Sequence, residues 1–245
     1  MSKSNAIVLN EKQIYEVKGL ASDTRQSFGV HPNVPIGNGI KLLLEKNDIL
    51  LCEYPFSDTD GTHTYGNITW FKTDNETITF IGLNTSSFYD EQIFAIAHEI
   101  YHYITQSGKA YTPDMEYEDT ITEKKADRFA AELLLPEAAL KTTAVGMLGS
   151  SDMRGIPETR LLRFIARIQC DWWLPFQAII NRLYEEGFID YDDLGVHPNE
   201  PDPLTTVKYP PALFGIDMIA DMVGGATVYA IEGTFSRGGL YHFIN

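Results

Sequence analysis

Residues 94–102 read Phe94-Ala95-Ile96-Ala97-His98-Glu99-Ile100-Tyr101-His102, with two histidines four positions apart and a glutamate directly after the first. This HExxH pattern is a signature of metal-dependent hydrolases. Successive helical residues lie about 100° apart around the axis, so His98 and His102 would lie about 40° from each other and could bind the same ion. Glu99 would lie one step round the helix. The alternative is a pair of hydrogen-bonded polar histidines without a metal.

The predicted helix also has an apolar face away from its histidines. Five residues share an arc of about 100° on that side, namely Ile93, Ile96, Ala97, Ile100 and Ile104. We therefore expect an amphipathic helix that ends near Thr105. Residues 84–87 offer N-cap side chains, and Ser87 stands three positions before Asp90, as in a capping box.

The composition is that of a globular protein with a sizeable core. Of 245 residues, 44% are apolar and 22% are charged. The chain has no run of eighteen apolar residues and no basic start followed by an apolar stretch, which predicts a cytoplasmic protein without a membrane span or secretory signal. Cys52 and Cys170 stand far apart, so we expect reduced, partly buried thiols rather than a disulfide or a cysteine metal site.

The formal net charge of −15 bears on the choice of partner. Binding to DNA, RNA or anionic lipid depends on Lys and Arg side chains that neutralise phosphates. The charge therefore disfavours direct nucleic-acid binding and favours a neutral or basic protein partner.

Two helices and three strands are expected before the HExxH helix. Apolar spacing and turn signals predict helices over 11–28 and 39–45 and strands over 48–54, 64–72 and 77–83, the last two forming a hairpin. A loop over 106–119 then leads into a helix over 120–136, which Pro136 stops.

This later helix carries two acids, Glu123 and Asp127, on a face shared with apolar residues. The opposite face is expected to hold Lys124, Lys125, Arg128 and Glu132. Without a metal, Glu123 would form a capping box with Thr120, and Asp127 a surface ion pair with Arg128 or Lys124. A zinc site needs a third protein ligand. The positions that supply it in the extended HExxHxxGxxH pattern are Thr105 and Gly108 here, so Glu123 is the candidate.

Together, HEIYH and the later EKKADRFAAELLLP resemble the ImmA/IrrE family of metallopeptidases, whose pattern is HExxH followed by E-x-x-A-[ND]-x-F-A, leucines and a proline. The resemblance implies His98, His102 and Glu123 as zinc ligands and Glu99 as general base. It implies Asp127 as an acceptor that orients a ligand histidine. The expected fold is α+β, a mainly helical zincin-like domain with a small three-stranded sheet.

Three segments are expected along the chain. A metallopeptidase domain covers 1–155, and a helix-turn-helix-like segment covers 156–195, with a helix break at Cys170-Asp171. An extension of unknown role covers 196–245 and includes a candidate helix over 212–222 and a closing hairpin. The arginines of the middle segment are balanced by acids, which favours packing or protein contact over DNA recognition.

The predicted function is a zinc-dependent endopeptidase. The resemblance implies a helix-turn-helix DNA-binding repressor as substrate, whose cleavage would switch on genes of a mobile element or a stress response. The alternatives are a non-proteolytic repressor-binding module or toxin–antitoxin component, and a transcription factor that uses residues 157–187. Donors for the oxyanion remain open among His63, Tyr101 and Tyr103.

Overall fold

The computed structural model describes residues 9–56, 64–72, 74, 76–107 and 116–189. The helices among these residues are α1 (Glu11–Ser27), α2 (Gly39–Lys46), α3 (Tyr89–Thr105), α4 (Glu116–Leu134), α5 (Glu137–Leu148), α6 (Glu158–Trp172) and α7 (Phe176–Glu185), and the strands are β1 (Ile49–Tyr54), β2 (Gly66–Lys72) and β3 (Thr77–Asn84). The fold is therefore α+β and mainly helical, as predicted. The chain divides into two compact units, Met1–Pro136 and Glu137–Asn245. The segments expected to end at 155 and 195 remain a prediction.

The first unit contains a three-stranded mixed sheet in the order β1-β3-β2. β3 pairs with β2 in antiparallel fashion, which confirms the predicted hairpin, and with β1 in parallel fashion. The buried face of β3 carries Thr79, Ile81 and Leu83. Because β3 lies in the middle of the strand order, β2 forms one edge of the sheet.

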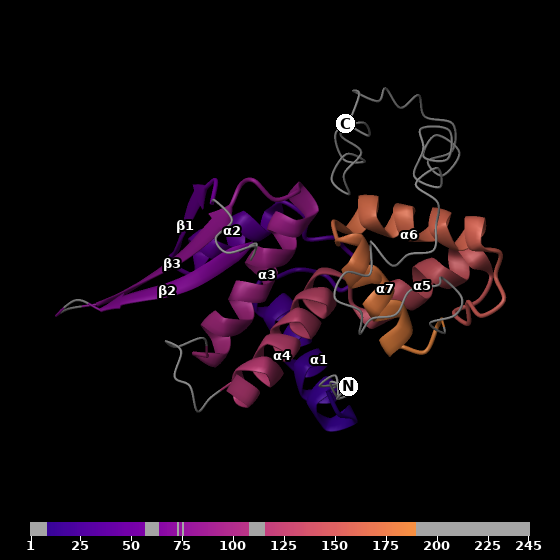
Figure 1. The fold of residues 1–245 in the computed structure, drawn as a ribbon, viewed down its shortest axis with the longest axis horizontal. Coiled ribbons are helices and arrows are strands. Elements are labelled where there is room, and N and C mark those ends of the chain that lie inside the picture. The colour runs from indigo at the N-terminus through magenta and orange to yellow at the C-terminus, as the bar shows by residue number, and fades with distance from the viewer. Residues whose placement is uncertain (1–8, 57–63, 73, 75, 108–115, 190–245) are drawn as a thin grey trace, which may run out of the picture. The chain divides into compact units, whose positions relative to one another are not determined.

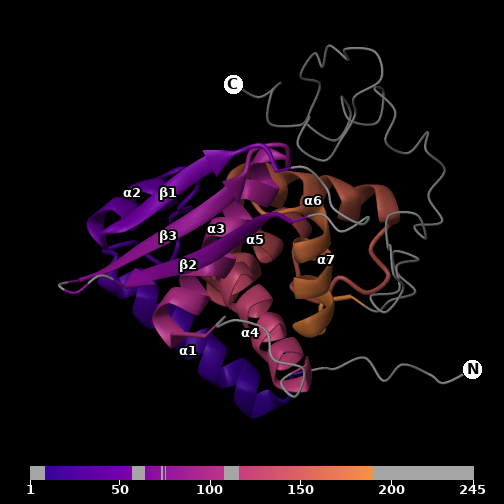
Figure 2. The same ribbon diagram turned by 60° about the vertical axis from the view of Figure 1, so that its left-hand side comes forward.

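Helix α3 lies between the sheet and α4. It contacts β2 and β3 on one side and α4 on the other, while α1 packs against α4 and α2 packs against β1 and α3 (Figures 1 and 2). Of the five predicted core positions of α3, Ile93, Ile96, Ala97 and Ile100 are buried. Ile104 is 37% exposed because it lies in the last turn, next to the end of the helix.

The predicted N-cap of α3 is wrong. Asn84 is fully buried, and its amide already accepts from the Phe56 and Ser86 N–H groups and donates to the Thr64 carbonyl. The helix begins at Tyr89, where the Glu91 carboxylate accepts from the Phe88 N–H at 3.1 Å. Asn84 therefore stabilises the loop before the helix.

Helix α4 begins at Glu116, inside the predicted loop. Thr120 is thus an interior helical residue and cannot form the capping box considered for Glu123. Arg128 and Glu132, expected to face solvent, are 3% and 7% exposed, because α4 is packed on two sides, by α3 and by α1.

A buried arginine fixes the end of α4 to the rest of the first unit. The Arg25 guanidinium on α1 donates to the carbonyls of Leu133, His31 and Val34. Burial lowers the Arg25 pKa to about 10, although the negative charge of Glu132 opposes this shift. The same side chain therefore ties α1, the loop after it and the last turn of α4 together.

The second unit differs from the prediction in two places. Helix α5 was not predicted, and α6 continues through Cys170-Asp171 to Trp172. The break comes at Trp173, whose backbone is left-handed (φ 58°) and whose N–H donates to the Gln169 carbonyl, just before Pro175. Helices α6 and α7 pack on each other, as the predicted helical pair.

The remaining predictions concern the C-terminal segment, the two cysteines and the absence of a membrane span. The predicted helix over 212–222 and the closing hairpin lie outside the described residues. Neither cysteine forms a disulfide, and Cys170 is partly buried as predicted, but Cys52 is exposed on β1 rather than partly buried. None of the described helices has the length and apolarity needed to cross a membrane.

Candidate metal centre

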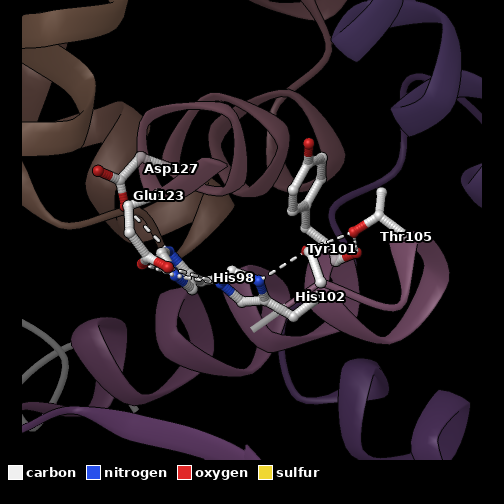
Figure 3. A network of polar contacts seen from close by, with 7 residues as sticks. His98, Tyr101, His102, Thr105, Glu123 and Asp127 are labelled. Carbon is white, nitrogen blue, oxygen red and sulfur yellow. Dashed lines mark hydrogen bonds and ion pairs between the residues drawn. The ribbon is translucent and has the colours of Figure 1, made fainter. Parts of the chain in front are cut away.

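Two neighbouring helices bring the predicted ligands to one point. His98 and His102 on α3 and Glu123 on α4 each direct one donor atom into a cluster, and these atoms all lie within 4.8 Å of one another (Figure 3). Among the described residues, this is the group of three that can hold a metal ion. The structure therefore brings together residues that are 25 positions apart in the sequence.

The donor atoms face each other closely. His98 Nε2 and His102 Nε2 are 3.1 Å apart, since positions four apart lie on one side of a helix. The Glu123 carboxylate contacts both rings, with Oε2 at 3.0 Å from His98 Nε2 and Oε1 at 3.3 Å from His102 Nε2. Two imidazole nitrogens and one carboxylate are the donor set of a catalytic zinc site.

Each of the two histidines has a partner on its other ring nitrogen. Asp127, one turn after Glu123 on α4, places Oδ1 at 3.0 Å from His98 Nδ1, where the resemblance put an orienting acceptor. Ser107 places Oγ at 3.0 Å from His102 Nδ1. No sequence pattern indicated Ser107, because it follows the end of the helix, where no periodicity applies.

A left-handed turn brings Ser107 back towards the helix. Gln106, the C-cap of α3, has φ 52° and donates its N–H to the His102 carbonyl. The Ser107 N–H donates to the same carbonyl at 3.2 Å. Capping of this kind satisfies free carbonyls at a helix end, and here it also sets the position of the Ser107 hydroxyl.

The electrostatics of the cluster favour a cation. Burial opposes a charge on His98, but hydrogen bonds to Asp127 and Glu123 outweigh it and raise the His98 pKa to about 10. Hydrogen bonds from His102 and His98 lower the Glu123 pKa to about 2. In the metal-free protein a proton on His98 thus occupies the space between three donor atoms. A metal ion that prefers imidazole nitrogen and carboxylate oxygen ligands would occupy the same place and displace that proton.

Glu99 lies beside the two histidines and under the edge of the sheet. The residue is 7% exposed, and burial raises its pKa, while the positive charges of His98 and His102 oppose the shift. Its carboxylate accepts from the Ile68 N–H of β2. A Cβ added at Gly66 would lie 3.7 Å from Glu99 Cγ and 3.2 Å from the Gly82 carbonyl. The strand β2 thus approaches Glu99 closely at Gly66, which has no side chain.

Two of the three candidate oxyanion donors, Tyr101 and Tyr103, lie among the described residues. Tyr101 is 7% exposed, with its ring 5.7 Å from the His102 ring and 5.6 Å from the Phe129 ring. Burial, and then the negative charge of Glu123, raise its pKa. Tyr103 is partly exposed, and His63 lies outside the described residues.

Comparison with known proteins agrees with this geometry. No curated protein matches the chain. Residues 44–171 match the family described as IrrE N-terminal-like domain, Peptidase_M78. The match spans more than half of the chain and contains the HExxH helix, Glu123 and Asp127. The chain therefore belongs to the IrrE N-terminal-like (ImmA/IrrE) family, a family of metallopeptidases.

Proposed function

We propose that the protein is a zinc-dependent endopeptidase, with His98, His102 and Glu123 as metal ligands and Glu99 as general base. The observation that carries the proposal is the convergence of three donor atoms within 4.8 Å, next to a buried glutamate. Zinc at this site would supply Lewis-acid polarisation of the scissile carbonyl and of the attacking water.

Glu99 is suited to move a proton. Its carboxylate would take the proton from the attacking water and deliver it to the nitrogen of the leaving amine. Burial raises its pKa, which strengthens it as a base and lets it hold the proton between the two steps. The hydrogen bond from Ile68 fixes the carboxylate in place.

The edge strand β2 offers a binding place for an extended peptide. The Asn84 N–H donates to the Tyr65 carbonyl, and residues of an antiparallel pair alternate between bonded and non-bonded positions. With Ile68 opposite Ile81, the amides of Gly66, Ile68 and Trp70 therefore point away from β3. Peptides that add a strand to a sheet edge use such groups. The Ile68 N–H is already used by Glu99, so a peptide would bond to the edge groups of Gly66 and Trp70, beside Glu99.

The proposed substrate is a helix-turn-helix DNA-binding repressor, cleaved to switch on genes of a mobile element or a stress response. A net charge of −15 supports a basic protein partner of this kind, because complementary charge speeds association. Incubation of the purified protein with repressors encoded next to its gene tests the proposal. Defined cleavage products support it, and an intact repressor in the presence of zinc counts against it.

Glu99→Gln separates the peptidase from a non-proteolytic repressor-binding module. The variant keeps the size of the side chain but loses the base. If the protein is a peptidase, the variant binds zinc like wild type and cleaves at least about a hundredfold more slowly. A binding module would retain its regulatory effect in the same variant, measured as expression from the repressed promoter.

A further inference from the structure

Beyond the ligands, a chain of hydroxyl groups runs from His102 to the backbone of its own helix. It passes from His102 Nδ1 to Ser107 Oγ at 3.0 Å, then to Thr105 Oγ1 at 2.6 Å, and ends at the Tyr101 carbonyl at 2.8 Å (Figure 3). The Ser107 and Thr105 hydroxyls can each donate one hydrogen bond. The direction in which these hydrogen bonds run is therefore set by the end of the series whose role as donor or acceptor is fixed.

The fixed end is the Tyr101 carbonyl, which can only accept. Thr105 must use its proton on this carbonyl, because two oxygens 2.8 Å apart repel each other without one. Thr105 is then the acceptor from Ser107, whose own proton is used in turn. Ser107 is left as an acceptor towards His102.

His102 must therefore carry a proton on Nδ1. With Nδ1 bonded to Ser107, Nε2 is the ring nitrogen left for a metal ion, and in the metal-free protein Nε2 faces His98 and hydrogen-bonds to Glu123. A neutral imidazole has one donor and one acceptor nitrogen, and the hydrogen bond to one nitrogen decides which atom binds a metal. The protons of Thr105, Ser107 and His102 are placed by matching each donor in this series to an acceptor.

We propose that Ser107 and Thr105 are positioning residues that keep a proton on His102 Nδ1 and so preset Nε2 as the nitrogen that binds a metal ion. Asp127 performs this task for His98 with a carboxylate, whereas His102 relies on two neutral hydroxyls. As far as it concerns metal binding, this proposal rests on the proposed zinc site. The proton on Nδ1 does not depend on the zinc site, because it is a property of the metal-free protein.

The test combines two measurements on the full chain. Nitrogen-15 spectra of the metal-free protein report which nitrogen of His102 is protonated, and competition with a chelator reports zinc affinity. Ser107→Ala removes the acceptor, Ser107→Thr keeps a hydroxyl, and Thr105→Val removes the donor to Tyr101. Matched controls are Ser150→Ala and Thr142→Val, since Thr142 also donates to a helical carbonyl four residues back, but in α5.

We expect Ser107→Ala to shift His102 away from the Nδ1–H form and to weaken zinc binding about tenfold. This is the lower end of the effect usually seen when a residue that hydrogen-bonds a ligand histidine is removed. Ser107→Thr should behave like wild type, and Thr105→Val should show a mixed tautomer with a smaller loss. A Ser107→Ala protein with the wild-type tautomer and affinity would overturn the proposal. A tautomer shift in a protein that binds no zinc would support it while refuting the zinc site.

Discussion

The His98 ring lies between two carboxylates, with Asp127 on Nδ1 and Glu123 on Nε2. This arrangement raises the His98 pKa to about 10 in the metal-free protein, against an ordinary value of 6.5. The folded state therefore binds this proton more tightly than the unfolded state does. The stabilisation is complete below about pH 6.5 and disappears as the pH rises through about 10.

The free energy of unfolding of the metal-free protein should accordingly fall between pH 6.5 and pH 10. For one proton the slope is at most about 1.4 kcal/mol per pH unit. Urea unfolding in the presence of a chelator measures it, and His98→Ala should reduce the slope. An equal decline in wild type and His98→Ala would show that other groups cause it.

Asp127 is predicted to support zinc binding through His98. Asp127→Ala removes the acceptor on Nδ1 and should weaken zinc binding by about 10 to 100-fold. Asp127→Asn keeps an oxygen acceptor but loses the charge, so its loss should be smaller. Chelator competition measures both, with Asp23→Ala, an exposed aspartate of α1, as the control. Wild-type affinity in Asp127→Ala would contradict this role.

At the scale of elements, the C-terminus of α3 is one of the places where the described backbone is strained. Gln106 adopts φ 52°, a conformation that costs about 1–2 kcal/mol for a residue with a Cβ, whereas glycine adopts it freely. Its side chain makes one exposed hydrogen bond, to the Tyr103 carbonyl. The turn brings Ser107 back to His102.

Gln106→Gly should therefore stabilise the protein by about 0.5–1 kcal/mol, since relief of strain exceeds the added entropy of the unfolded chain. Zinc affinity should stay at the wild-type value because Ser107 remains. Urea unfolding measures the change. Gln177→Gly, within α7, is the contrasting control and should destabilise by about 1 kcal/mol. Destabilisation by Gln106→Gly would contradict this account of the turn.

The sequence predicted the elements whose pattern is local. Helical periodicity placed His98 and His102 on one face, and alternation placed β2 and β3 in a hairpin. The spacing from His102 to Glu123 was meaningful only through the family resemblance. Burial of Arg128 and the contact of Ser107 with His102 depend on tertiary packing and on a left-handed turn, and neither leaves a periodic signal.

At the scale of the whole molecule, the candidate metal centre lies entirely within the first unit. His98, His102, Ser107, Glu123 and Asp127 all precede Pro136, where that unit ends. The family match nevertheless continues to residue 171, through α5 and most of α6. The donor atoms of the proposed metal site therefore all come from the first unit.

Metal content is the most direct test of the central claim. Plasma mass spectrometry on the purified protein, after zinc is offered and excess is removed, should find about one zinc ion per chain in wild type. Glu123→Ala should hold much less, while Glu16→Ala, an exposed glutamate on α1 paired with Lys12, should equal wild type. Wild-type protein without stoichiometric zinc, or Glu123→Ala with a full complement, would contradict the three-ligand site.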